Sequence, residues 1–351
     1  MYRSSDLEDR LKYVPGIAGQ LEFRRRSKVK ETMAALPEPL PVQGQSVLER
    51  IIVPLDGSAR AEEVLNLVVP LSEMLGAQLT LLHVLLPRYE MPGRTGEISY
   101  PDTLHDRARA LATDYLAEVA KNYVQERVRT KTVIAAGRVS DMILAHAEHG
   151  SFSMIAVGAR PRTRFLRFFR ECITETIWVR ATTPLLFWTP PTDGDGLAAE
   201  SRLPRSIVIP INGTSRADAA LDYVRQIAVA AGMSVTLLGI KPARSLRLTN
   251  GQNGIKYSES PDEYLEERSE RLRSAGLSAD VIRTDQQAAD ALLSVEIELP
   301  AHIVVTIGGR RRTLNRAFFG YAVTRLVRRV SNPIIFLPPG YEPPGEDHES
   351  E

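Results

Sequence analysis

The stretch RIIVPLDGSARAEEVLNLVVPLSEMLGAQLTLLHVLL, residues 50–86, predicts a strand, a tight turn, a helix and a second strand. The nearly continuous apolar run Ile51–Leu55 is typical of a strand that is buried on both faces of a parallel sheet. Gly57 allows a sharp turn, and Ser58 can cap the free amides of a helix that starts at about Ala59. With a return strand over residues 79–85, the stretch forms a right-handed βαβ unit, whose ligands gather at the carboxyl ends of the strands.

The same unit returns in RSIVIPINGTSRADAALDYVRQIAVAAGMSVTLLGIK, residues 205–241. The two copies align without a gap, and every matched pair has the same offset, as Pro54 and Pro210 show (210 − 54 = 156). A block of identities this long at one offset indicates the duplication of a whole domain rather than a short solenoid repeat.

Length and composition are those of an ordinary two-domain globular protein. The chain has 351 residues, of which 43% are apolar and 25% are charged, and this length suits two cores. A net charge of +1 implies no overall attraction to nucleic acid or to an anionic membrane. The single cysteine, Cys172, cannot form an internal disulfide, and neither a signal region nor a bilayer-spanning stretch is apparent. We therefore expect a cytoplasmic protein.

The chain divides into five parts. We expect a partly flexible N-terminal extension over residues 1–48, a first domain over 49–191, a linker over 192–203, a second domain over 204–340 and an acidic tail over 341–351. Two interpretations of the extension stay open. It is a flexible leader with a proline-rich spacer, or its apolar and basic residues dock on a protein partner or on the chain's own domains.

Strands alternate with helices in both copies. In the first copy we expect further helices over 103–125, from Gly137 and over about 168–179, and strands over 128–135, 154–157 and 184–188. One side of the 103–125 helix carries an apolar stripe made of Leu104, Ala108, Leu111, Tyr115, Leu116 and Val119. In the second copy we expect a helix over 261–274 and strands over 279–282, 303–307 and 333–337. This order predicts an α/β fold of two tandem, open, parallel five-stranded sheets of Rossmann-like type.

Five segments resemble the universal stress protein family. They are IIVPLDGS (51–58), LLHV (81–84), the helix start at Gly137, IAVG (155–158) and TPLL (183–186). The resemblance covers residues 49–190 and 204–339, and it implies the tandem form with an adenine nucleotide alpha hydrolase-like fold. It also implies that the last strands of the two copies, Leu185–Trp188 and Ile334–Leu337, pair in an intrachain pseudo-dimer, because bare apolar edges promote aggregation.

Nucleotide-binding members of this family carry a loop after the fourth strand with the pattern G-x-x-G, nine residues, then G followed by Ser or Thr. Here the first copy reads Gly158-Ala159-Arg160-Pro161, with Glu171 where the last glycine would stand. The second reads Gly308-Gly309-Arg310-Arg311, followed by a shortened spacer and Gly320-Tyr321. Proline offers no amide and a carboxylate repels phosphate, so both loops are degenerate.

The resemblance nevertheless identifies candidate nucleotide-binding residues. It puts Asp56 near a ribose or metal, Val84 against a base, and Gly158 with the Ala159 amide near phosphates, where Ser58 would share the contact. The full candidate set is Asp56, Gly57, Ser58, Val84, Gly158, Ala159 and Arg160 in the first copy, and Asn212, Gly213, Thr214, Gly308, Gly309, Arg310 and Gly320 in the second.

The predicted function is that of a non-catalytic stress-response module for binding or regulation, with degenerate nucleotide-type crevices and no required cofactor. The alternative is an ATP or AMP sensor in which the arginines of one loop contact phosphate directly, although charge runs of this kind also form solvated faces. A weak ATPase stays open. We predict no catalytic residue, no nucleic-acid partner and no metal site, since His146, His149 and Glu148 lack a further ligand.

Overall fold

The computed structural model describes residues 48–86, 101–150, 153–158, 173–188, 203–211, 215–240, 261–286, 288–299, 301–307, 332–338 and 341. The predicted N-terminal extension up to residue 47, the linker up to residue 202 and the tail from residue 342 lie outside these ranges.

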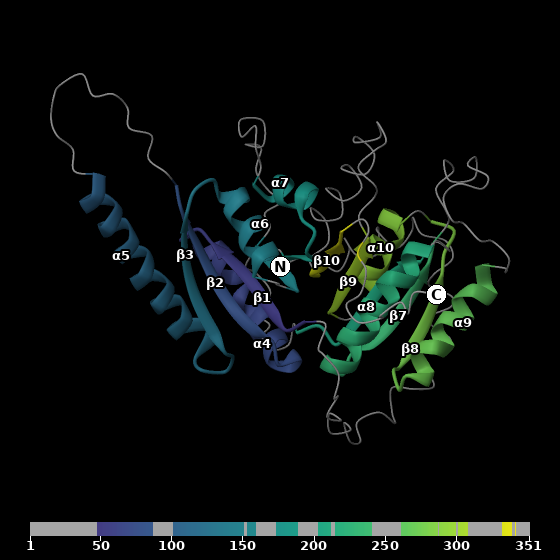
Figure 1. The fold of residues 1–351 in the computed structure, drawn as a ribbon. Coiled ribbons are helices and arrows are strands. Elements are labelled where there is room, and N and C mark those ends of the chain that lie inside the picture. The colour runs from purple at the N-terminus through teal and green to yellow at the C-terminus, as the bar shows by residue number, and fades with distance from the viewer. Residues whose placement is uncertain are drawn as a thin grey trace, which may run out of the picture.

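The strands form one ten-stranded sheet that runs through both halves of the chain (Figure 1). The first half contributes β1 (Arg50–Leu55), β2 (Gln78–Leu85), β3 (Thr130–Ala136), β4 (Met154–Gly158) and β5 (Leu185–Trp188). The second half contributes β6 (Ser206–Ile211), β7 (Ser234–Gly239), β8 (Ala279–Arg283), β9 (His302–Ile307) and β10 (Ile334–Leu337). The order across the sheet is β3-β2-β1-β4-β5-β10-β9-β6-β7-β8. The observed strands agree with the predicted ranges to within two residues.

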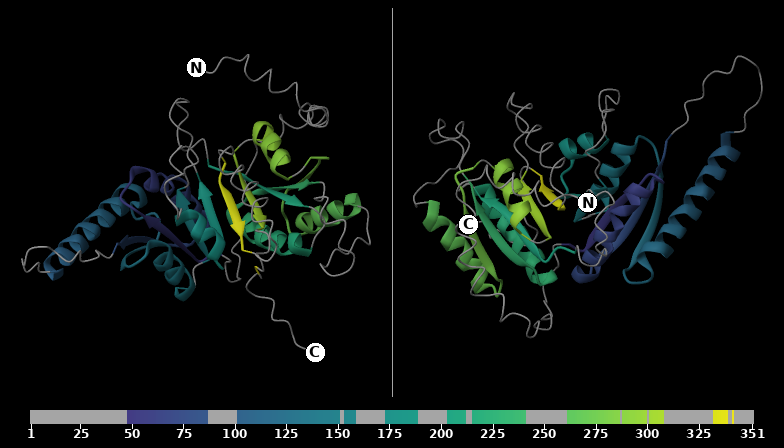
Figure 2. Two further views of the ribbon diagram at one scale, coloured as in Figure 1. Left: turned by 90° about the horizontal axis from the view of Figure 1, so that it is seen from above. Right: turned by 180° about the vertical axis from the view of Figure 1, so that it is seen from behind.

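The two halves meet at β5 and β10. These strands pair antiparallel, with Ile334 opposite Phe187, Ile335 opposite Leu186 and Phe336 opposite Leu185, whereas all other neighbours are parallel. β10 accordingly lies in the middle of the molecule (Figure 2). The pseudo-dimer is confirmed, but the prediction of two separate five-stranded sheets needs correction. The edge strands hydrogen-bond to each other, so the two sheets become one.

Helices cover both faces of the sheet. Those on one face are α3 (Ala59–Glu63), α4 (Leu65–Leu75), α5 (Pro101–Val119), the π-helix η1 (Ala120–Val124), α8 (Ser215–Ala231) and α9 (Pro261–Ser274). Those on the other face are α6 (Val139–His149), α7 (Ile173–Arg180) and α10 (Ala288–Glu298).

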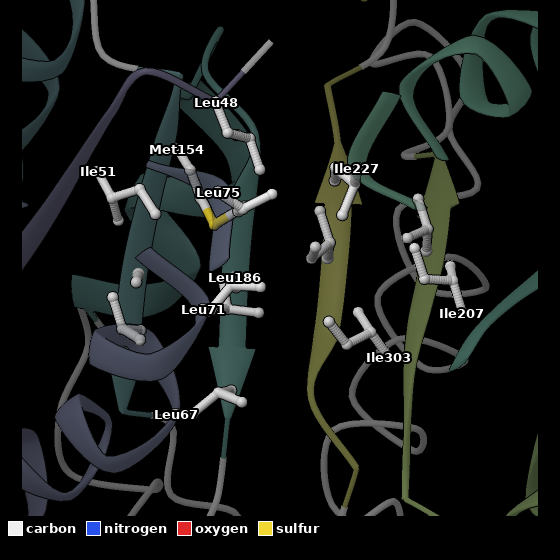
Figure 3. Close-up of a cluster of buried hydrophobic side chains, with 14 of the residues drawn as sticks. Leu48, Ile51, Leu67, Leu71, Leu75, Met154, Leu186, Ile207, Ile227 and Ile303 are labelled. Carbon is white, nitrogen blue, oxygen red and sulfur yellow. The ribbon is translucent and has the colours of Figure 1, made fainter. Parts of the chain in front are cut away.

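Each face has a hydrophobic core that continues from one half into the other. The α4-side core includes Val53, Val68, Leu81, Leu186, Ile207, Val224 and Ile335. The α6-side core includes Ile52, Leu82, Ile143, Ile155, Phe187, Val208, Leu292 and Phe336. Figure 3 shows side chains of the α4-side core from both halves, among them Leu186 and Ile303. Phe187 and Phe336 meet edge to face across the seam, with ring centroids 5.4 Å apart. The two halves therefore share their cores.

The helices depart from the predicted pattern in three places. The first helix begins at Ala59 as predicted, but it is interrupted at Val64, and Pro70 lies within the second piece, α4. The helix predicted over 103–125 ends in the π-helix η1, because the amide of Gln125 donates to the carbonyl of Ala120. α10 was not predicted, although Ala291, Leu292 and Val295 have the spacing of a buried helix face.

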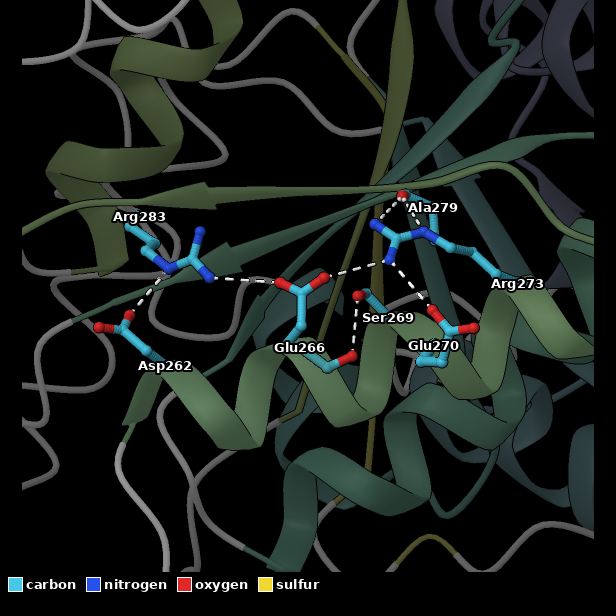
Figure 4. Close-up of polar contacts among 7 residues, drawn as sticks. All are labelled: Asp262, Glu266, Ser269, Glu270, Arg273, Ala279 and Arg283. Atoms are coloured by element: carbon cyan, nitrogen blue, oxygen red, sulfur yellow. Dashed lines mark hydrogen bonds and ion pairs between the residues drawn. The ribbon is translucent and has the colours of Figure 1, made fainter.

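A chain of ion pairs holds α9 beside β8 (Figure 4). Arg283 pairs with Asp262 and Glu266, and Arg273 pairs with Glu266 and Glu270. Arg273 also donates two hydrogen bonds to the Ala279 carbonyl at the start of β8. These contacts fix an outer helix to an edge strand.

Within the described part of the chain, no helix combines the length and the apolar character that a bilayer crossing requires.

Candidate functional site

The turn after β1 is fixed by hydrogen bonds among its own residues. The Asp56 carboxylate accepts from the Ser58 amide at 3.0 Å and from the Ser58 hydroxyl at 2.5 Å, and both bonds reach Oδ1. Ser58 Oγ in turn accepts from the Ala61 amide at 3.2 Å, so Ser58 is the N-cap of α3, as predicted. Gly57 has a φ of +85°, which an L residue adopts at a cost. The predicted turn of Asp56, Gly57 and Ser58 is therefore present, and its hydroxyl is engaged in the cap.

Replacement of Ser58 by alanine is expected to lower the free energy of unfolding by about 1 kcal/mol, the usual effect of losing an N-cap side chain. Urea denaturation of wild type and of the Ser58→Ala and Ser58→Asp variants measures this change in the free energy of unfolding. Aspartate restores an oxygen for the Ala61 amide, so the second variant serves as the control. Equal stability of wild type and Ser58→Ala would show that the cap does not stabilise the fold.

The carboxyl end of β2 lies beside this turn. Leu55 and His83 are opposite each other in the parallel pair of β1 and β2, and His83 Nδ1 lies 2.8 Å from the Leu55 carbonyl oxygen. The imidazole thus donates Nδ1–H to the backbone. Its ring also meets the Tyr115 ring edge to face, with centroids 5.7 Å apart. The next residue, Val84, packs against the α6-side core and is only partly exposed.

The end of β4 closes against the first turn of α3. A Cβ at Gly158 would lie 2.9 Å from the Arg60 carbonyl oxygen and 3.5 Å from Ala61 Cα. No side chain fits in that space without displacement of the α3 backbone. Gly158 is therefore required by the approach of α3 to the sheet, a role that the sequence interpretation did not assign to it.

Tyr115 of α5 reaches the same region. Its hydroxyl donates to Glu62 Oε1 at 3.0 Å. Burial raises the pKa of the Tyr115 hydroxyl above its usual range, the bond to Glu62 and the Glu62 charge raise it further, and a backbone hydrogen bond from Gly57 opposes the rise. Burial, followed by the charges of Glu62 and Glu63, also raises the pKa of Tyr123. The phenols remain protonated donors, which suits their position beside carboxylates.

The sequence interpretation missed this cluster of Glu62, Tyr115 and Tyr123. Tyr115 was assigned to the apolar stripe and Glu62 to the helix dipole. The sequence could have indicated this cluster through the spacing of Tyr115 and Tyr123, which puts both side chains on the same side of the predicted 103–125 helix.

The second half differs from the first at the end of β7, the strand that corresponds to β2. His83 aligns with Gly239, and a Cβ at Gly239 would lie 2.5 Å from Cδ1 of Leu265 on α9. An apolar side chain therefore contacts the end of β7, where the first half has an imidazole and a phenol. The remaining predicted candidates, Ala159, Arg160, Asn212, Gly213, Thr214, Gly308, Gly309, Arg310 and Gly320, lie outside the described residues.

Four of the described candidates lie beside α3, namely Asp56, Gly57, Ser58 and Gly158. The fifth, Val84, lies on β2, which pairs with β1. No group of three histidine, cysteine or carboxylate side chains that could hold a metal ion occurs in the described ranges. His146 and His149 each direct Nδ1 to a carbonyl of their own helix, at 2.8 Å.

Comparisons with known proteins agree with the tandem fold. The model of the Universal stress protein family matches residues 48–187 and 204–338. A universal stress protein from Archaeoglobus fulgidus DSM 4304 aligns with 85% of this chain and 100% of its own, with a TM-score of 0.61 and 17% identity. A putative universal stress protein from Pseudomonas aeruginosa UCBPP-PA14 aligns with 83% of this chain and 94% of its own, with a TM-score of 0.49 and 14% identity. No curated protein matches the sequence. At such identities the structural likeness concerns the fold alone.

Proposed function

Because the chain belongs to the universal stress protein family and carries its domain twice, we propose that it is a non-catalytic stress-response module for binding or regulation. Its nucleotide-type crevices bind ATP weakly or not at all, and no cofactor is required. The single cysteine in 351 residues is consistent with work in a reducing cytoplasm.

One observation carries the proposal. In the first half, the two described groups that the resemblance assigns to phosphate contacts are engaged within the protein. The Ser58 hydroxyl donates to Asp56 and accepts from the Ala61 amide, and Gly158 packs against the Arg60 carbonyl. A carbonyl oxygen beside Gly158 also presents partial negative charge where a phosphate would need a donor.

The loop sequences support the same conclusion. Pro161 lacks an amide and Glu171 carries a negative charge, so the first loop lacks at least two of the usual phosphate donors. A hydrogen bond to a charged group contributes about 1.5 to 3 kcal/mol, so two lost bonds correspond to roughly two to four decades of affinity.

The test is a thermal-shift series in millimolar MgATP together with a phosphate-release assay. We expect an unchanged melting temperature and no phosphate release above the buffer blank. A ligand at a hundred times its dissociation constant would stabilise the fold by about 2.7 kcal/mol, which is readily detected.

A clear rise in melting temperature would overturn the proposal. If Arg160→Ala or Arg310→Ala then cancels the rise, the arginine-based ATP or AMP sensor replaces it. The single variant Asp56→Ala shows whether any binding occurs at the turn after β1.

A further inference from the structure

Helix α3 buries little side-chain surface of its own, although its first turn lies against Gly158 of β4. It has five residues, none of them is buried, and only Ala61 packs partly against the α4-side core. A helix this short has no stability of its own, so other contacts must fix its position. The helical hydrogen-bond pattern is interrupted at Val64, although its φ of −60° and ψ of −26° are helical, and the following residues Leu65, Leu67 and Val68 are buried.

Tyr115 supplies contacts to three segments around α3. Its hydroxyl bonds to Glu62 on α3 and lies close to the Gly57 backbone in the turn, and its ring lies against His83 at the end of β2. His83 in turn bonds to the Leu55 carbonyl. One side chain of α5 therefore connects the turn after β1, the helix that follows it and the neighbouring strand.

The second half has neither the interruption nor the phenol at this contact. α8 is continuous from Ser215 to Ala231, and the α9 residue that meets Gly239 is Leu265. The two halves have the same order of strands, but they differ at the helix that follows the first strand of each half. In the first half a short helix is tied by polar groups, and in the second one continuous helix follows the first strand.

We propose that the Tyr115 hydroxyl and the Glu62 carboxylate form a positioning pair, which holds α3 and the Asp56-Gly57-Ser58 turn against α5 and β4. The pair acts through the protein and contacts no ligand in this scheme. It deepens the proposed function, because the turn holds the candidate residues Asp56, Gly57 and Ser58 and leads directly into α3. The test of the positioning pair measures the protection of backbone amides and does not depend on nucleotide binding. The positioning pair and the proposed function can therefore be contradicted separately.

The test is hydrogen–deuterium exchange of the full-length protein, followed by mass spectrometry of peptides that cover residues 56–63. Tyr115→Phe keeps the ring and Glu62→Ala removes the carboxylate. A hydrogen bond to a charged group corresponds to a factor of roughly 10 to 100 in the local opening equilibrium, so each variant should speed exchange of these amides by that factor. Peptides from β1 and α4 should exchange as in wild type.

Two further variants separate the pair from general packing. The double variant Tyr115→Phe, Glu62→Ala should exchange no faster than either single variant, because each single change already breaks the bond. Glu62→Gln keeps an acceptor oxygen and should restore most of the protection. Tyr264→Phe makes the same chemical change on α9 and should leave residues 56–63 unchanged.

The inference is wrong if Tyr115→Phe leaves the exchange of residues 56–63 at the wild-type rate. It is also wrong if the effects of the two single variants multiply in the double variant, or if faster exchange spreads over β1 and α4.

Discussion

Replacement of Leu186 by aspartate is expected to destabilise both halves of the protein together and to lower the free energy of unfolding by about 5 kcal/mol. Leu186 and its partner Ile335 are fully buried and lie opposite each other at the seam of β5 and β10. The substitution removes a buried leucine and puts an unpaired carboxylate into the α4-side core. Loss of burial costs about 2 kcal/mol, and the buried charge costs several more.

The effect reaches both halves because the cores are continuous. Leu186 belongs to a cluster that includes Val53 of the first half and Ile207 of the second. Loosening of the seam also exposes the apolar edges of β5 and β10. We therefore expect one unfolding transition in wild type and a single, earlier transition in the variant.

Urea denaturation followed by circular dichroism and by intrinsic fluorescence measures this prediction. Leu111→Asp is the matched control, because Leu111 on α5 is 64% exposed and the same change there should alter stability by less than about 0.5 kcal/mol. Two separate transitions in wild type, or equal midpoints for wild type and Leu186→Asp, would contradict the shared core.

Replacement of Gly158 by valine is expected to lower the free energy of unfolding by about 3 kcal/mol, at the upper end of the range for overpacking. The first added carbon would already lie 2.9 Å from the Arg60 carbonyl oxygen, which is a backbone atom and cannot rotate away. The two further methyl groups require α3 to move off β4. Faster hydrogen exchange of α3 should accompany the loss of stability.

Gly232→Ala separates this steric effect from the conformational freedom of glycine. Gly232 has a φ of +63°, and a Cβ there would meet nothing within 4 Å, so only the left-handed backbone resists the change. That cost is about 1 to 2 kcal/mol. A Gly158→Val protein as stable as wild type, with unchanged exchange in α3, would show that α3 does not pack on β4 as described.

Local features of the sequence determined the elements of this fold. The apolar run Ile51–Leu55 gave β1, and Ser58 caps the helix that starts at Ala59 as predicted. The duplication predicted a second set of strands, and the resemblance to the universal stress protein family, together with the apolar character of Leu185–Trp188 and Ile334–Leu337, predicted their pairing. The predictions of single elements succeed because a cap and a period-2 or period-3.6 pattern depend on neighbouring residues alone.

Only the tertiary structure decided which groups meet around the candidate site. Leu111 and Tyr115 share one predicted apolar stripe, yet Leu111 is 64% exposed while Tyr115 bonds to Glu62, 53 residues away in the chain. Gly158 was interpreted as a phosphate contact, and the structure adds that it admits the backbone of α3. The interruption at Val64 and the π-helix Ala120–Val124 were also not predicted. The physical reason is that these features arise where segments far apart in the sequence pack together, and the pattern of one segment does not record the shape of its partner.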